Sequence, residues 1–176
     1  YEIGFKHHQL IGPATMEVAL TQKASIRRYS DAPDGHYRIY TSDARFTLPF
    51  SLGNLQGRYE GEGRLQYADT PVPGRLSFSI GSRYSVRGFD GKQSLSSQKG
   101  WLLRNAFAFP MGNTGQELYW AVDAGSVHGH AATTLAGHHL FGTALGFRGS
   151  RHDFQYDLTA GWPLHKPKGF DTRAQT

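Results

Sequence analysis

The sequence predicts an all-β protein in which long antiparallel strands form a transmembrane β-barrel. Three observations support this fold class. Along most of the chain, apolar side chains alternate with polar or small ones at a period of two, as in strands with one apolar face. Several alternating segments have nine residues or more, the length that a tilted strand needs to cross a bilayer. The connections between these segments alternate between short and long, as they do at the two rims of a membrane barrel.

Eight strands follow from this pattern. We expect them at about 1–9, 14–24, 37–50, 55–67, 101–110, 117–125, 138–149 and 153–162. In the first strand, the apolar positions Tyr1, Ile3 and Phe5 alternate with polar or glycine positions. The same alternation gives one apolar face to three later strands: Ala44, Phe46, Leu48 and Phe50; Leu118, Trp120, Val122 and Ala124; and Phe154, Tyr156, Leu158, Ala160 and Trp162. We expect these faces to meet lipid.

The fourth strand, at 55–67, separates its two faces most sharply. One face is apolar or glycine, and the other carries four charges: Arg58, Glu60, Glu62 and Arg64. A single lysine or arginine that faces lipid at mid-bilayer costs about 2–4 kcal/mol, so four charges on a lipid face would be prohibitive. We therefore expect these side chains to face a water-filled lumen, where opposite charges also compensate each other.

The connections follow a regular order of lengths. Four are short, near 11–13, 51–54, 111–116 and 150–152. Three are long, at 25–36, 68–100 and 126–137. The longest is too polar and too rich in glycine and serine for a strand or a core helix. Six aromatic side chains at or near strand ends fit the two membrane interfaces: Tyr59, Tyr67, Trp101, Trp120, Tyr156 and Trp162.

Composition narrows the classes of function. The net charge is +5, but lysine and arginine are scattered and no nucleic-acid-binding motif is present, so no nucleic acid partner is predicted. No stretch approaches the roughly eighteen consecutive apolar residues of a membrane helix. The chain has no cysteine, which suits a protein that must cross an oxidising compartment without forming wrong disulfides.

Catalytic, metal and cofactor sites are not predicted. The chain has no nucleophile elbow, phosphate-binding loop or paired-carboxylate motif, so no enzyme activity is expected. Four histidines lie in or beside the 126–137 connection: His128, His130, His138 and His139. Structural zinc sites need organised ligands, usually four, which a loop rich in glycine, alanine and threonine does not provide. We therefore expect neither a metal nor a cofactor.

Two segments carry a resemblance to a known family. The first is GSRYSVRGFDG at 81–91, followed by GWLLRN at 100–105, and the second is AGWPLHKPKGF at 160–170. Together they resemble the C-terminal half of the barrel of TpsB transporters, the outer-membrane haemolysin, haemagglutinin and adhesin secretion–activation proteins of two-partner secretion. The segments HHQLIGP at 7–13 and AVDAG at 121–125 fit the same pattern in the same order. The resemblance therefore covers essentially the whole chain.

The resemblance implies a fold and a function. TpsB barrels have sixteen strands behind periplasmic POTRA domains, and they pass an unfolded exoprotein, a TpsA-type adhesin or cytolysin, to the surface of a Gram-negative cell without ATP. Residues 1–176 would then be the C-terminal part of a monomeric barrel in outer-membrane lipid. We expect this chain to lack the POTRA domains, the first half of the barrel and the closing strand.

The resemblance also implies that the loop at 68–100 folds back into the lumen. Its tip, Val86, Arg87, Gly88 and Phe89, would then reach the inner wall. A loop in a water-filled lumen needs a polar anchor, and an arginine fork can hold a carboxylate with two hydrogen bonds. The candidate acceptor is Asp123, which faces inward by strand parity. Gly88 would allow a sharp turn, and Phe89 and Tyr84 would pack the tip.

Other interpretations stay open at this point. Arg87 is also compatible with an ordinary exposed loop, and an anchored loop is compatible with either a fixed latch or a gate. A barrel-assembly or insertion factor of the same superfamily is the main alternative function, and an outer-membrane barrel enzyme is a weaker one. A neighbouring gene for a large secreted adhesin or cytolysin would favour secretion.

Overall fold

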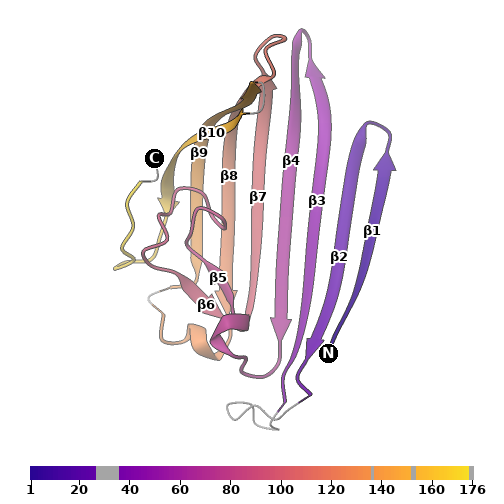
Figure 1. Cartoon of the computed structure of the whole chain (residues 1–176). Coiled ribbons are helices and arrows are strands. Elements are labelled where there is room, and N and C mark those ends of the chain that lie inside the picture. Colours follow the sequence, from indigo (N-terminus) through magenta and orange to yellow (C-terminus); the bar gives the residue numbers. More distant parts are fainter. Residues whose placement is uncertain (27–35, 136, 152–153, 175–176) are drawn as a thin grey trace.

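The computed structural model describes residues 1–26, 36–135, 137–151 and 154–174. Eight long strands form one antiparallel sheet in the order β1-β2-β3-β4-β7-β8-β9-β10 (Figure 1). Their bounds are β1 Glu2–Ile11, β2 Ala14–Ala24, β3 Arg38–Leu52, β4 Leu55–Ala68, β7 Lys99–Pro110, β8 Gln116–His128, β9 His139–Arg151 and β10 Phe154–His165. Each bound lies within three residues of the predicted one, so the all-β antiparallel prediction is confirmed.

The connections sort by length between the two ends of the sheet. The tight turns β1–β2, β3–β4 and β7–β8 lie at the upper end in Figure 1, and the long connections after β4 and β8 lie at the lower end. Some predictions fall partly on residues outside the described ranges. These are the connections at 25–36, 126–137 and 150–152 and the first residue of the strand predicted at 153–162. No helix in the described ranges is long and apolar enough to cross a membrane.

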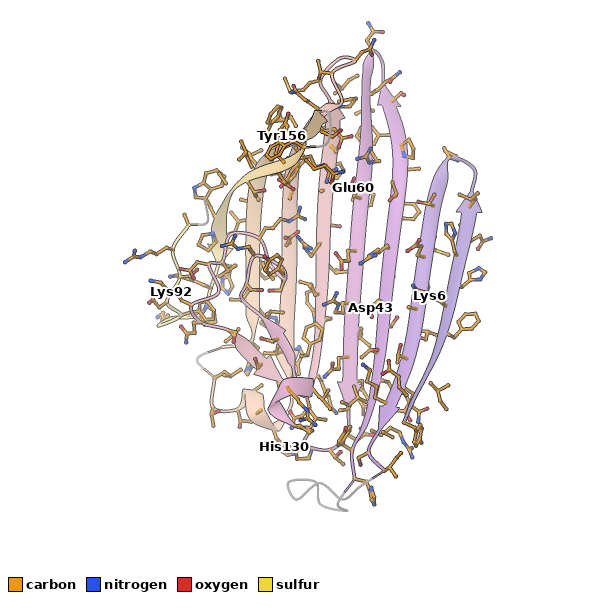
Figure 2. All side chains as sticks on the ribbon, viewed as in Figure 1. Lys6, Asp43, Glu60, Lys92, His130 and Tyr156 are labelled. Atoms are coloured by element: carbon orange, nitrogen blue, oxygen red, sulfur yellow. The ribbon has the colours of Figure 1, made fainter. Side chains whose placement is uncertain are left out.

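The two faces of the sheet differ as the alternation predicts. On β8, Tyr119, Ala121 and Asp123 are buried on the inner face, whereas Trp120 points outward with 48% of its surface exposed. Aromatic rings on the outer face contact each other from strand to strand, with Tyr59 and Phe107 5.2 Å apart and Phe107 and Trp120 5.9 Å apart. Side chains project from both faces, and Asp43 and Glu60 come from the neighbouring strands β3 and β4 (Figure 2).

The long connection between β4 and β7 is more ordered than its composition suggested. It contains the 3-10 turn η1 (Gly74–Leu76) and the antiparallel strands β5 (Phe78–Ile80) and β6 (Leu95–Ser97). The prediction of a segment without strands was therefore wrong. The averaged polarity hid two three-residue strands, whose apolar side chains Phe78, Ile80 and Leu95 are all buried. A further 3-10 turn, η2 (His130–Ala132), follows β8.

The β4–β7 loop packs on the inner face of the sheet and forms the largest apolar core with it. The loop, the wall and the segment after β10 contribute together: Phe78, Ile80, Val86, Phe89, Leu95, Leu102, Val127, Leu140 and Phe170. Burial of apolar area contributes roughly 25 cal/mol per Å², so this core stabilises the folded-in position of the loop. The structure therefore holds the loop tip against the wall rather than in solvent.

Candidate functional site

An ion pair joins the loop tip to the wall. The Arg87 guanidinium donates from Nε to Asp123 Oδ2 at 2.7 Å and from Nη2 to Asp123 Oδ1 at 2.6 Å. The main-chain N–H of Arg87 also donates to Oδ2, at 2.9 Å, and that of Asn105 donates to Oδ1 at 3.2 Å. The Asp123 side chain is fully buried, so the carboxylate depends on these donors in place of water.

Two glycines let the loop backbone approach the wall. Gly142 on β9 faces the main-chain oxygen of Arg87, and a Cβ at Gly142 would overlap that oxygen. Gly88 has a φ of 101°, a conformation that L side chains rarely adopt, and a Cβ there would overlap the carbonyl oxygen of Trp162. The tip thus touches both β9 and β10 through backbone, and a larger residue at either glycine would push it away.

Phe89 and Tyr84 occupy different environments. Phe89 is fully buried, and its ring lies 5.8 Å from that of Phe170 in an edge-to-face arrangement. Val86, on the other side of Arg87, is also fully buried. Tyr84 does not pack the tip, because 80% of its surface is exposed, and that expectation was wrong. Ser85 ties the backbone of the turn through Gly81 and Ser82, and this local turn directs Tyr84 away from the core.

The segment after β10 holds the loop from the other side. Asp171 donates its main-chain N–H to Gln93 Oε1 at 2.7 Å, and Arg173 donates its own to Asp90 Oδ2 at 3.2 Å. The main-chain N–H of Lys92 also donates to the Asp90 carboxylate. This hydrogen bond lowers the pKa of Asp90 below its usual value, and the weaker effects of the hydrogen bonds from Arg173 and Thr172 act in the same direction. Sequence reasoning missed these contacts, because they join segments about eighty residues apart.

The predicted lumen charges form two connected groups on the inner face. In one, Arg58 and Arg148 each contact both Glu60 and Glu117, at 2.7–3.0 Å. In the other, Arg64 pairs with Asp43 at 2.8 Å and contacts Glu62 at 3.5 Å. The first group joins β4, β8 and β9 across the inner face, and the second joins β3 and β4. In both groups opposite charges lie in contact, so they compensate each other.

Arg104 connects the second group to the anchor. Its Nη1 lies 3.4 Å from Glu62 Oε2, and its Nε lies 3.7 Å from Asp123 Oδ2. Arg104, Glu117 and Arg148 were not identified from the sequence. Strand parity places all three on the inner face, as it does the charges of the fourth strand and Asp123, so the sequence held the signal for them.

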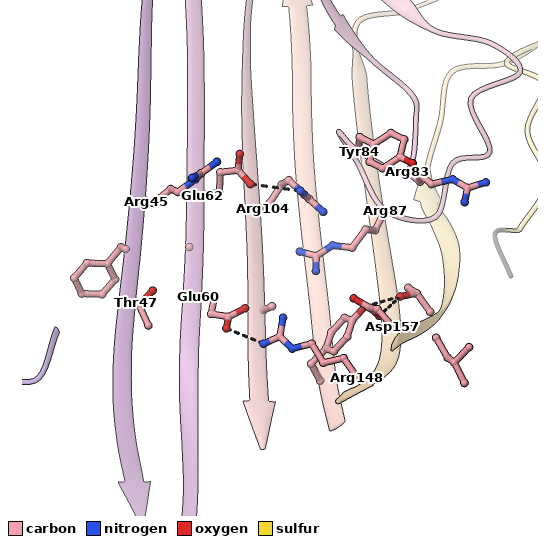
Figure 3. Close-up of a pocket in the computed structure, with 16 residues that line it drawn as sticks. Arg45, Thr47, Glu60, Glu62, Arg83, Tyr84, Arg87, Arg104, Arg148 and Asp157 are labelled. Atoms are coloured by element: carbon pink, nitrogen blue, oxygen red, sulfur yellow. Dashed lines mark hydrogen bonds and ion pairs between the residues drawn. The ribbon is translucent and has the colours of Figure 1, made fainter. Parts of the chain in front are cut away.

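A cavity of about 750 Å³ lies between the wall and the loop. Figure 3 shows Glu60, Glu62, Arg104 and Arg148 on the wall side, with the side chain of Arg87 reaching in from the loop. Tyr119 closes one side and donates to Asp157 Oδ1 at 2.9 Å. The cavity is therefore polar and charged, with both signs represented, which suits a wetted passage better than an apolar ligand pocket.

The histidines beside β8 and β9 lie close together. The ring centroids of His128, His138 and His139 are 5.8–6.4 Å apart. Within the described ranges, no group of three or more histidine, aspartate or glutamate side chains is arranged to hold a metal ion.

Comparisons with known proteins agree on one family. The model of the haemolysin secretion/activation protein family ShlB/FhaC/HecB matches residues 1–149. The outer membrane transporter CdiB-2 of Burkholderia pseudomallei (strain 1026b) is 36% identical over 144 residues, which cover 80% of this chain and 25% of that protein. The structure of CdiB from Acinetobacter baumannii superposes with a TM-score of 0.87 at 28% identity, covering 98% of this chain and 31% of that one. The chain thus spans about a quarter to a third of the length of these relatives.

Proposed function

Because the chain belongs to the haemolysin secretion/activation family ShlB/FhaC/HecB, we propose that it forms the loop-bearing part of an outer-membrane pore that secretes a partner exoprotein. Members of this family are transporters of the Gram-negative outer membrane, and the outer membrane is the location of this chain. In the proposed protein, residues 1–176 are the C-terminal part of a sixteen-strand barrel with POTRA domains before it. Barrels of sixteen to eighteen strands are wide enough to leave an aqueous channel.

The docked loop is the observation that carries this proposal. An inner face lined by compensated charges suits a water-filled channel, and a loop folded onto that face narrows it. The loop is held by a buried ion pair, an apolar core and hydrogen bonds from the segment after β10, and it adds no strand to the eight-strand sheet, so it can leave without unfolding that sheet. A channel with a removable plug is what regulated passage of a polypeptide requires.

The proposed cargo is an unfolded exoprotein of the TpsA type, an adhesin or a cytolysin. Compensated wall charges offer few free groups to a passing chain, so they favour movement over tight binding. The pore would act as a monomeric barrel in outer-membrane lipid, with no nucleic acid, cofactor or ATP. We propose no catalytic role, and none for the hydrogen bond of 2.8 Å between Ser126 and His128, because Ser126 is fully buried.

Deletion of the gene for the full-length protein tests this function. We expect one large protein to disappear from the medium or cell surface and to be retained in the cells, because its channel is missing. Expression of the full-length protein from a plasmid should restore it, which is measured by comparing secreted and cell-bound proteins by mass spectrometry. Unchanged secretion together with a general loss of outer-membrane barrels would instead support the insertion-factor alternative.

A further inference from the structure

Asp123 has a second arginine within reach, and this arginine does not belong to the loop. Arg104 on β7 lies directly opposite Asp123 on β8 in the register of the two strands. Its Nε is 3.7 Å from Asp123 Oδ2, beyond the usual 2.7–3.2 Å of a hydrogen bond. The Nε atom is buried and has no hydrogen-bond partner within the described ranges. The wall therefore carries a charged donor close to the carboxylate but not bonded to it.

Departure of the loop would remove most of the donors to Asp123. Among the described residues, three of the four hydrogen bonds to its carboxylate come from Arg87, two from the guanidinium and one from the main chain. The fourth, from the Asn105 main chain, belongs to the wall. With the loop away, the carboxylate faces the lumen and loses both charge-assisted bonds, so a cation on the wall that replaced Arg87 would lower the cost of the loop's departure.

We propose that Arg104 is this replacement, a positioning residue that exchanges with Arg87 on Asp123 when the loop leaves the wall. Arg104 needs to move its Nε by only about 1 Å to reach charge-assisted hydrogen-bond distance. Its Nη1 is held by Glu62, so the side chain already lies over the wall between the two carboxylates. This inference rests on the proposed function in one respect, because the proposed function supplies the reason for which the loop leaves the wall.

The exchange predicts in which direction the removal of the Arg104 charge shifts the balance between docked and undocked loop. With the loop docked, Arg104 is near Asp123 without a hydrogen bond, and its charge repels that of Arg87. With the loop undocked, Arg104 is the main partner of Asp123. Removing its charge therefore favours the docked state, whereas removing the charge of Arg87 favours the undocked state. A purely structural arginine would have the opposite effect, because its loss would loosen the wall and release the loop.

The test measures the position of the loop directly. Spin labels are attached to two cysteines introduced into a full-length protein with no other cysteine, Tyr84→Cys on the loop and Thr47→Cys on β3. The distance between the two labels is measured during a urea titration. We expect Arg104→Gln to raise the ratio of docked to undocked protein by about tenfold, the worth of one charge-assisted hydrogen bond. Arg104→Lys should stay near the parent ratio, since it keeps a cation that reaches Asp123.

The controls separate this effect from a general change in the lumen. Arg45→Gln removes a charge from the same cavity but lies on β3, away from Asp123, and should leave the ratio unchanged. Arg87→Gln should shift the ratio toward the undocked state. A ratio that is unchanged or lower in Arg104→Gln would overturn the exchange, and so would a failure of Arg104→Lys to restore it. Because the readout is a distance, it tests the exchange of the two arginines on Asp123 whether or not the pore secretes the proposed cargo.

Discussion

Arg87→Ala and Asp123→Ala should each lower secretion by about tenfold or more, and the double substitution should be little worse than either. The two side chains share two charge-assisted hydrogen bonds of 2.6 and 2.7 Å around a fully buried carboxylate. Bonds of this kind contribute about 1.5–3 kcal/mol each, and removing either partner removes both bonds. Groups in one such network do not act additively, so the second substitution has little left to remove.

Secretion per barrel is the measurement for this pair. It compares exoprotein in the medium with the amount of full-length transporter in the outer membrane, so that a folding defect is not read as a transport defect. Arg83→Ala is the matched control, because Arg83 is an exposed arginine four residues before Arg87 on the same loop. Defects of the two single substitutions that multiply in the double variant would show that the residues act separately.

Removal of the loop should abolish secretion and open the barrel. The deletion removes residues 70–98, because β4 ends at Ala68 and β7 begins at Lys99. The sheet register places Gln66 opposite Gly100, so a short glycine–serine turn can join the two strands without moving them. The loop fills the inner side of β7–β10, so we expect single-channel conductance of the full-length barrel to rise several-fold.

Insertion of the shortened barrel in the membrane should remain intact, since the eight-strand ladder does not depend on the loop. The barrel should unfold at a lower temperature, because Leu102, Val127 and Leu140 lose their apolar cover. A glycine–serine loop of the original length is the control, and it should fail in secretion as the deletion does. Normal secretion by the shortened barrel would contradict any role for this loop in transport.

Much of the sheet was predictable because period-two alternation reports directly which face of a strand meets water. It placed Asp123 on the inner face and Trp120 on the outer face, and it located the charged side of β4. The family motif, rather than the alternation, pointed to Arg87 at the loop tip. These predictions depend on residues that are neighbours in sequence or in a repeating pattern.

The parts that were not predicted depend on contacts between distant segments. The short strands β5 and β6 are too brief to show a period, and they form only because they pair with each other over the wall. Phe170 is buried against Phe89 from about eighty residues away, and no local pattern marks that contact. Tyr84 was misplaced because an aromatic residue beside a tip motif indicates packing, whereas the turn made by Ser85 points it outward.

Passage of the exoprotein along this wall is tested most directly by site-specific photo-crosslinking in living cells. The photoreactive residue is placed at Thr47 or Tyr84, which line the cavity, or at Leu118, which is half exposed on the outer face, in the full-length protein. The exoprotein is stalled in transit by a stably folded domain fused behind it. We expect crosslinks to the exoprotein from Thr47 and Tyr84 and none from Leu118. Crosslinks from Leu118 alone, or from none of the three while the stalled exoprotein spans the membrane, would contradict passage through this lumen.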